Sequence, residues 1–433
     1  MTEPISASGL IQTVRVGFAK IEDHRAANTK ISLSDALMSG FAMFSLKDSS
    51  LLEFDQRRQA KDENLKQIYG IENIPCDTQM RTIFDPVVPA VLRPIFKDIF
   101  RLVEQAQVLE QMVFMNGYYL LSLDGSGYFS SKKVHCPFCL EKHHSQSGEI
   151  TYSHQILAGA IVHPDFEVVI PLAPEPIVKQ DGQTKNDCER NAAKRFLAQL
   201  RQDHPDLPLI ITEDALSANA PHLRELQKHH LRYILSVKVG DHPFLFDYVE
   251  TAHQTGQTTT YEKQGKGVFH RFRFINQVPL NASNQDLLVN FIEYWEITPS
   301  QTQHFCKITD FTVTKSNVFE LMRGGRTRWK IENETLNTLK NQGYHLEHNY
   351  GHGFQSLSVV FVLLMMLAFL VDQVQQLAST LFQAVLKKEG SRKRLWDHLR
   401  ALFYTLEFTS LEDIFRALLY GYKVEGLTIL GPT

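Results

Sequence analysis

Hydrophobic and polar residues follow different periods in different parts of the chain. Over residues 1–115 apolar side chains recur near the helical spacing of about 3.6 residues, which predicts a helical N-terminal region. Residues 353–433 also predict helices. Within them, 357–377 predicts a buried helix, because the longest apolar run, 359–371, is shorter than the ~20 residues that span a membrane.

Between these helical ends, β-rich runs precede and then alternate with helical ones. The pattern predicts strands at 118–129, 150–162 and 166–172, a helix at about 186–200, a strand at 207–212, a helix at 220–230 and a strand at 232–239. Strand–helix–strand alternation implies crossover connections and parallel pairing. The predicted class is therefore α/β, a mixed sheet with helices on its faces.

Residues 240–312 return to β-type composition. We interpret them as a β-rich subdomain inserted into the α/β core, with strands at 258–261, 268–275 and 289–297. A polar helix predicted at about 316–339 follows. The expected organisation is a helical region at 1–115, the core at 116–239, the insertion at 240–312, a core helix at 313–352 and a helical region at 353–433.

The composition is that of a globular protein. The 433 residues are 43% hydrophobic and 21% charged, enough for two or three domains. Forty-five Lys and Arg against 48 Asp and Glu leave a net charge of −3, so DNA binding would depend on local basic patches. Five cysteines favour a reducing cytoplasm over a disulfide framework, and the first ten residues lack a secretory signal pattern.

Three carboxylates occupy positions at which an open α/β sheet places its chemistry. Asp124 interrupts an otherwise apolar strand, Asp214 follows the strand 207–212, and Glu332 lies on the helix after the insertion. Convergent acids provide oxygen ligands for Mg²⁺ or Mn²⁺, and two such ions can catalyse phosphodiester cleavage. Taken singly, each acid is more typical of a helix cap or a solvated loop.

Neighbouring acids remain alternatives to these ligands. Glu213 adjoins Asp214, and Glu334 is two residues from Glu332, so either would be the ligand if the predicted register were displaced. Glu189 lies in the first turn of the first core helix. Its residue pattern is also that of a capping box, which would give it a purely local role.

In this order of elements the sequence resembles the DDE transposases of bacterial insertion sequences, in the insertion-sequence-four superfamily. The resembling segments are Leu123-Asp124-Gly125-Ser126, Thr212-Glu213-Asp214-Ala215 and Arg328-Trp329-Lys330-Ile331-Glu332, and the resemblance covers about residues 118–350. It implies a ribonuclease H-like core with a β-rich insertion before the glutamate. It further implies that Asp124, Asp214 and Glu332 bind two Mg²⁺ (or Mn²⁺) ions, and that a freed 3′-hydroxyl attacks target DNA.

The resemblance also bears on DNA contacts. The superfamily signature is Tyr, two residues, Arg, three residues, Glu, six residues, Lys; here Gly325 takes the tyrosine position and Leu339 the lysine position, with Lys340 one step on. A DNA-hairpin intermediate is therefore not implied. Clustered cations suit phosphates, so the expected DNA-binding residues are Arg326, Arg328, Lys330 and Lys340. Gly324 and Gly325 would let the backbone approach a phosphate.

A second constellation is a Cys-x-x-Cys segment followed by histidines. Cys136 and Cys139 have zinc-knuckle spacing, and thiolate and imidazole ligands suit tetrahedral Zn²⁺. The predicted ligands of this possible zinc site are Cys136, Cys139, His143 and His154, with His144 and His135 as alternatives for the histidine positions. A pair of reduced thiols in a histidine-rich loop is the other interpretation.

The favoured hypothesis is thus a DNA transposase acting on the inverted-repeat ends of its element and on target DNA. As implications of the resemblance, we expect end recognition by the N-terminal region and a homodimer on DNA. We also expect a cytoplasmic, nucleoid-associated protein that does not use a membrane. Two alternatives remain open: a non-catalytic DNA-binding remnant of a transposase, and a metal-dependent nuclease without strand transfer.

Overall fold

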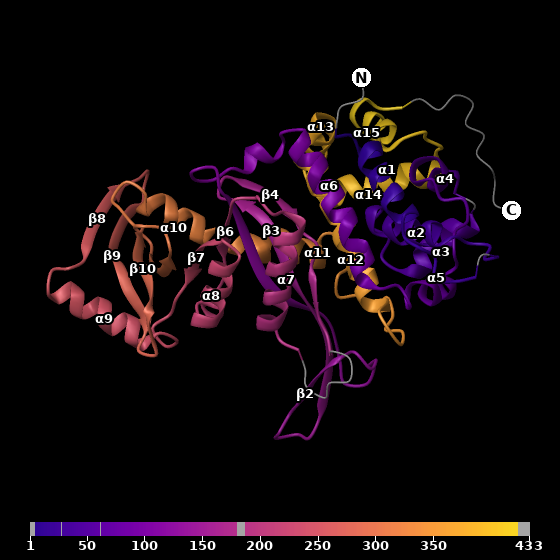
Figure 1. Ribbon diagram of the computed structural model, residues 1–433. Helices are drawn as coiled ribbons and strands as arrows, with labels where there is room; N and C mark the ends of the chain where they lie inside the picture. The colour runs from indigo at the N-terminus through magenta and orange to yellow at the C-terminus, as the bar shows by residue number, and fades with distance from the viewer. Residues whose placement is uncertain (1–4, 27, 61, 180–186, 423–433) are drawn as a thin grey trace. The chain divides into compact units, whose positions relative to one another are not determined.

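The computed structural model describes residues 5–26, 28–60, 62–179 and 187–422 of the chain (Figure 1). The chain divides into two compact units. The first, the helical unit, combines Met1–Val108 with Thr338–Thr433. The second, the sheet unit, is the continuous segment Leu109–Asn337. The two ends of the chain therefore contribute to one unit.

Helices make up the helical unit, as the residue pattern predicts for both ends of the chain. They are α1 (Ala7–Ala19), α2 (Leu33–Ser45), α3 (Leu51–Gln59), α4 (Glu63–Tyr69), α5 (Asp77–Phe84), α6 (Arg93–Gln105), α12 (Leu357–Ala378), α13 (Thr380–Glu389), α14 (Arg392–Thr405) and α15 (Leu411–Tyr420). Serine side chains cap several of them; Ser32, for example, accepts a hydrogen bond from the backbone N–H of Asp35 at the start of α2.

Helix α12 is the core of the helical unit. Most of its 22 residues are buried, and it packs against α2, α1 and α6. Gly40 lets α2 come close, because a Cβ there would lie 2.8 Å from Leu364 Cδ1. By length and composition α12 could cross a membrane, but 94% of its most apolar window is buried inside the structure, which confirms the predicted buried helix.

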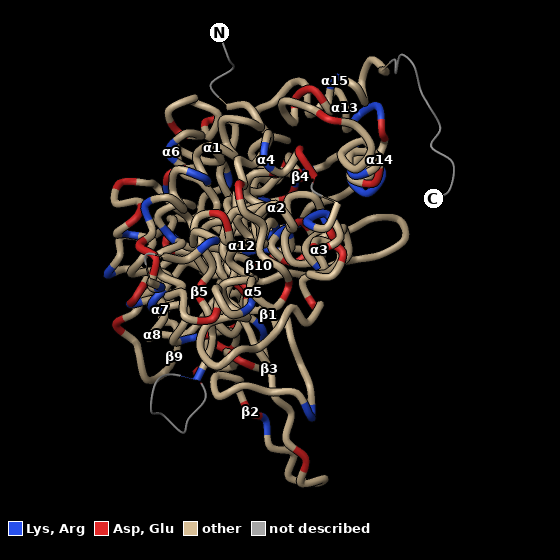
Figure 2. The backbone as a smooth tube through the Cα atoms, turned by 90° about the vertical axis from the view of Figure 1, so that its right-hand side faces the viewer, with Lys and Arg blue, Asp and Glu red and all other residues tan. Residues whose placement is uncertain are grey.

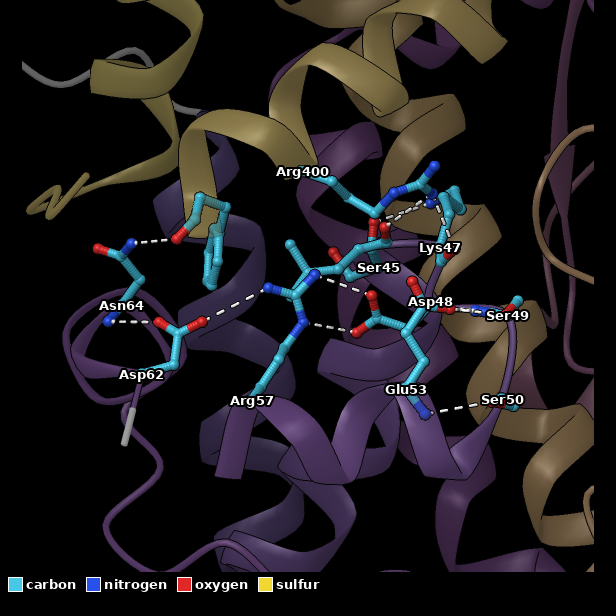
Figure 3. Close-up of polar contacts among 12 residues, drawn as sticks. Ser45, Lys47, Asp48, Ser49, Ser50, Glu53, Arg57, Asp62, Asn64 and Arg400 are labelled. Carbon is cyan, nitrogen blue, oxygen red and sulfur yellow. Dashed lines mark hydrogen bonds and ion pairs between the residues drawn. The ribbon is translucent and has the colours of Figure 1, made fainter. Parts of the chain in front are cut away.

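Buried charges in the helical unit are paired with opposite charges. Figure 3 shows Arg57 between two acids, with Nε 2.7 Å from Asp48 Oδ2 and Nη1 3.4 Å from Asp62 Oδ2. Lys47 Nζ lies 2.6 Å from Oδ2 of Asp372 on α12. Because an unpaired buried charge costs several kcal/mol, these pairs favour the one arrangement of helices that satisfies them.

The sheet unit is built on one mixed sheet, which has eleven strands among the described residues. They are β1 (Tyr119–Ser131), β2 (Leu140–His143), β3 (Ile150–His163), β4 (Phe166–Pro171), β5 (Glu175–Ile177), β6 (Leu209–Thr212), β7 (Arg232–Ser236), β8 (Thr259–Gln264), β9 (Phe269–Asn281), β10 (Asn284–Ile297) and β11 (Thr302–Thr309). Helix α7 (Glu189–Asp203) precedes β6, and α8 (Ala220–Lys228) connects β6 to β7. The core strands and both helices lie where the sequence pattern predicts them, within a few residues at each end.

The order of the strands defines the core. It is β2-β3-β1-β6-β7-β11-β10-β9-β8, with β4 and β5 also paired to β3. Strand β1 is antiparallel to β3 and parallel to β6, and β6 is parallel to β7. Helical crossovers account for the parallel pairs. A central β1 with antiparallel strands on one side and parallel strands on the other confirms the expected ribonuclease H-like α/β core.

The segment after β7 extends this sheet. It begins with α9 (Pro243–Gln254), a helix that the residue pattern did not predict, and continues through β8, β9 and β10. Strand β11 then pairs antiparallel with both β10 and β7, with Ile308 opposite Leu235. The inserted strands therefore continue the core sheet, as Figure 1 shows.

The helix expected after the insertion is interrupted. Its parts are α10 (Val318–Arg326), the π-helical turn η4 (Ile331–Leu336) and α11 (Asn337–Asn341). Gly325 lets α10 approach β7, because a Cβ there would lie 2.8 Å from Ile234 Cγ2. Gly324 lies against Phe114 and Ile234 in the same way. The glycine pair therefore packs a helix onto the sheet, and the expectation that it exposes backbone to a phosphate is wrong.

Candidate active site

Asp124 and Asp214 lie on neighbouring strands. Strands β1 and β6 run parallel with Ser122 opposite Thr212. Each aspartate follows its member of that pair by two residues, so the two aspartates come to the same edge of the sheet. Asp214 also caps a short turn, because its Oδ1 accepts a hydrogen bond from the Leu216 N–H at 2.9 Å.

Ser122 links this edge to the segment that carries Glu332. Its buried hydroxyl oxygen lies 3.3 Å from the carbonyl oxygen of Thr212 and 3.2 Å from that of Arg328. Arg328 is itself buried, and its Nη1 donates a hydrogen bond to Glu332 Oε1 at 2.7 Å. Glu332 thus faces the site from a π turn, a rare distortion that is frequent at functional sites.

The pKa of Asp124 responds to the neighbouring acids. Burial raises it most, the negative charges of Glu332, Glu189 and Asp214 raise it further, and Arg328 lowers it. The outcome is a pKa raised from 3.8 to about 7. The charges of three further carboxylates therefore act on Asp124, and that of Arg328 opposes them. Such a group is stable at neutral pH only when a proton or another cation offsets its charge.

Glu189, one of the alternative acids, lies in the first turn of a helix as the residue pattern predicts. Helix α7 begins at Glu189, after an N-cap residue, Cys188, that makes no side-chain capping hydrogen bond. The carboxylate turns toward β1 instead. A Cβ on Gly125 would lie 2.5 Å from Glu189 Oε2, so only glycine leaves room for this approach. Burial and then the charge of Asp214 raise the pKa of Glu189.

Glu213 has a different environment from its neighbour Asp214. It is buried, and its Oε2 lies 2.6 Å from His222 Nε2 while Oε1 accepts a hydrogen bond from the Ser217 hydroxyl at 3.3 Å. Glu213, His222 and Glu189 line a cleft of about 320 Å³. Since histidine holds the Glu213 carboxylate, the geometry favours Asp214 as the acid of this pair that faces Asp124.

The four expected DNA-binding cations all have partners within the chain. Arg326 forms an ion pair with Glu296 on β10, and Lys330 Nζ donates a hydrogen bond to the Phe166 carbonyl at 2.6 Å. Lys340 Nζ lies 2.9 Å from Glu347 Oε1, and Arg328 is bonded to Glu332 as described. Figure 2 shows basic and acidic residues interspersed along the chain, consistent with the net charge of −3. A DNA phosphate would therefore have to compete with acids or a backbone carbonyl of the chain for these cations.

The predicted zinc ligands come together in part. Cys136, Cys139 and His154 are buried and form one cluster in the sheet unit. His143 does not belong to this cluster: it is exposed on β2, with Nε2 3.4 Å from Glu141 Oε2. The alternatives also have other contacts, because His135 stacks on the Tyr152 ring and His144 hydrogen-bonds to Thr151. These contacts depend on the antiparallel pairing of β2 with β3, which residue spacing alone could not predict.

The carboxylate site fits divalent cations by the chemistry of its donors. Asp124, Asp214, Glu332 and Glu189 offer oxygen ligands, which Mg²⁺ and Mn²⁺ prefer. Burial and three neighbouring acids raise the pKa of Asp124, against the opposing charge of Arg328. A bound cation would remove this repulsion, so the residues present are suited to a metal-dependent reaction.

Comparison with known proteins gives a finding independent of this geometry. A family model described as "Transposase DDE domain" matches residues 142–370, slightly more than half of the chain. Asp214 and Glu332 lie inside the matched segment, and Asp124 lies before it. No curated protein matches the chain.

Proposed function

This chain belongs to the transposase DDE-domain family, and on that premise we propose that it is a Mg²⁺-dependent transposase of an insertion sequence. It would cleave DNA at the inverted-repeat ends of its element and join the freed ends to target DNA. Asp124, Asp214 and Glu332 would hold two Mg²⁺ or Mn²⁺ ions. Since two ends must be joined together, the active form on DNA would be a homodimer.

One observation carries this proposal. Parallel pairing of β1 with β6 brings Asp124 and Asp214 to one edge, and the charge of Glu332 is the largest electrostatic influence on Asp124 after burial. Acids from a strand, a strand end and a helix thus meet in one partly buried group. A fold with no use for cations gains nothing from such mutual repulsion, which costs about 1.4 kcal/mol for each pKa unit.

The proposed mechanism assigns the chain's own residues to binding and orientation. When bound, two divalent ions supply Lewis acidity and activate the attacking oxygen. Asp124, Asp214 and Glu332 would hold these ions at the edge of the sheet where β1 and β6 pair. Arg328, held by Glu332, places a positive charge beside the phosphate. Attack by water frees a 3′-hydroxyl, and in the second step that hydroxyl attacks a target phosphodiester.

Glu189 is assigned as a further acid of this site. Its carboxylate lies against Gly125, the residue after Asp124, and the charge of Asp214 acts on it. It would help to hold the second ion. A Glu189→Gln variant should therefore keep partial cleavage activity and require more Mg²⁺ than the wild type.

The test is cleavage of a labelled duplex that carries the inverted repeats flanking the gene, in Mg²⁺ or Mn²⁺. We expect the wild type to nick at the repeat boundary and Asp124→Asn to lose at least ~10³-fold in rate. Asp165→Asn is the matched control. Asp165 is an exposed aspartate of the β3–β4 turn, on the same sheet, that pairs with Arg323 instead of the acidic cluster.

The alternatives give different results in the same assay. If the protein is a DNA-binding remnant, both the wild type and the variant would bind the repeats. Neither would cut them, whichever divalent metal is supplied. A nuclease would cut the repeats but would not join a pre-cut 3′-hydroxyl end to a target plasmid. A transposase yields both products, and both depend on Asp124.

A further inference from the structure

We propose that Cys136, Cys139 and His154 bind a structural Zn²⁺ ion in the β1–β3 arm. The arm consists of the part of β1 beyond Asp124, strand β2 and the first half of β3. Figure 1 shows it extending from the rest of the sheet unit, with β2 near its end. This site is separate from the acids of the candidate active site and uses softer ligands.

Distances within the cluster match the edges of a zinc tetrahedron. Zn–S bonds of about 2.3 Å and Zn–N bonds of about 2.0–2.1 Å at tetrahedral angles place two sulfurs about 3.8 Å apart and a sulfur and a nitrogen about 3.6 Å apart. The two sulfur atoms are 3.7 Å apart, and His154 Nε2 lies 3.3 Å from each. All three ligand atoms therefore already surround one point.

The backbone around the cysteines is folded as a ligand loop. The Cys139 N–H donates to the Cys136 carbonyl at 3.2 Å, and the Cys136 N–H donates to Cys139 Sγ at 3.4 Å. The second of these hydrogen bonds, from an N–H to a sulfur, favours a sulfur that carries negative charge, as in a metal thiolate. A disulfide is excluded in this structure, because its sulfurs would be about 2.05 Å apart.

The surroundings of the cluster are suited to a fixed site. Cys136 is 7% exposed, Cys139 1% and His154 2%, so the ion would be shielded from water. The Tyr128 ring stacks on the His154 ring with centroids 5.8 Å apart. The Lys179 N–H, just after β5, donates to the carbonyl of Phe138 between the two cysteines. These contacts hold the ligand loop on the sheet from both sides.

The position of His154 indicates what the ion would do. It lies opposite Phe129 in the β1–β3 ladder, and the same ladder pairs Asp124 with Ala158. A bulge between Gly127 and Phe129 separates the two pairs. A cross-link from the loop to His154 would fix the strand register beyond that bulge and thereby hold β1 beside the acids. The sheet unit supplies three ligands, and the fourth position would take a water or another donor.

The first test is metal content of the full-length protein. We expect about one zinc per chain in the purified wild type, and at least a tenfold lower content in Cys136→Ser and Cys139→Ser. Cys188→Ser is the matched control, because Cys188 is exposed at the start of α7, outside the cluster, and its loss should leave the zinc content unchanged. A wild type that neither contains zinc nor takes it up from a stoichiometric supply overturns the proposal.

A second measurement covers the case in which the serine variants fail to fold. X-ray absorption at the zinc edge of the wild type should show two sulfur neighbours at about 2.3 Å and nitrogen or oxygen neighbours at about 2.0–2.1 Å. A first shell without sulfur contradicts the assignment. Chelation should then speed hydrogen exchange in residues 128–154 while leaving β6 and β7 protected, and an unchanged arm would refute the structural role.

Discussion

Two groups of charged side chains in this protein, one in each unit, are arranged in opposite ways. In the helical unit Arg57 and Lys47 each face carboxylates at hydrogen-bonding distance. In the sheet unit the negative charges of neighbouring acids act on Asp124, and the charge of Arg328 opposes them. The first arrangement satisfies each charge within the chain. The second arrangement has an excess of negative charge, which a bound cation can offset.

This difference separates structural from functional electrostatics. A paired cluster is complete without a ligand, so its residues serve the fold and their removal should lower stability. A like-charged cluster opposes folding, so removing one of its members should raise stability while it abolishes function. The signs of the stability changes therefore test the assignment of each cluster independently of any DNA assay.

Arg57→Met should give the largest stability change. The methionine keeps much of the apolar stem but leaves Asp48 and Asp62 without their cation, and the guanidinium also lies 3.5 Å from the centre of the Tyr404 ring. Breaking a buried pair in this way typically costs about 3–5 kcal/mol. Urea unfolding of the two proteins measures the difference.

The neighbouring arginine provides the control. Arg58 is partly exposed and pairs with Asp55 one helical turn away on α3, so Arg58→Met should cost less than about 1 kcal/mol. If both variants lost the same stability, the loss would come from helix α3 in general, and the buried pairing of Arg57 would carry no special weight.

Lys47→Met should have a smaller effect, of about 2–4 kcal/mol. Burial raises the pKa of Asp372 and lowers that of Lys47, and for both groups burial outweighs their mutual attraction. Asp372 can therefore take up a proton when Lys47 is removed, and it keeps the hydrogen bond donated by the Tyr344 hydroxyl. Because Asp372 can be neutralised in this way, Lys47→Met should lose less stability than Arg57→Met.

The double variant Lys47→Met/Asp372→Leu sharpens the point. Removing both partners removes both charges of this pair, although the Tyr344 hydroxyl loses its acceptor. The stability of the double variant should therefore exceed that of Lys47→Met and lie within about 2 kcal/mol of the wild type. A double-mutant cycle measured by urea unfolding gives the coupling. Strictly additive losses would show that Lys47 and Asp372 do not act as a pair.

The contrast between the two clusters can be predicted only in part from the sequence. Arg57 and Arg58 are adjacent and chemically identical, and only tertiary packing buries one of them and leaves the other partly exposed. By comparison, β-rich runs and their alternation with helices predict β1, β6 and their parallel pairing. The meeting of Asp124 and Asp214 follows from that pairing, although their role as metal ligands stays a prediction.

Two features of the site depend on details that residue types do not record. A π turn differs from an α turn only in which carbonyl accepts each N–H, so Ile331–Leu336 could not be distinguished from ordinary helix. An extra residue in such a turn shifts the side chains that follow it by one position around the helix axis. Glu189 was only one of several alternative acids, because its approach to β1 depends on the absent Cβ of Gly125.

The smallest of these effects is a gain of stability in Asp124→Asn. The folded-state pKa of Asp124 is about 7 and its ordinary value is 3.8, so between those pH values the folded protein binds a proton that the unfolded chain does not. The carboxyl's contribution to stability is therefore greatest below pH 3.8 and declines as the pH rises to about 7. Asparagine does not titrate, so Asp124→Asn does not lose this stability as the pH rises. Because the site is partly exposed, we expect a gain of only about 1–2 kcal/mol at pH 8.

Thermal unfolding at pH 5 and pH 8, with EDTA and then with Mg²⁺, measures this gain. In EDTA the advantage of Asp124→Asn should grow from pH 5 to pH 8. In Mg²⁺ it should shrink or reverse, because bound metal stabilises the wild type in proportion to occupancy and the variant lacks a ligand. Asp165→Asn, the exposed control, should show neither trend. A wild type that is more stable than Asp124→Asn at pH 8 in EDTA would mean that Asp124 is paired as Arg57 is, and the contrast between the two units would fail at its central residue.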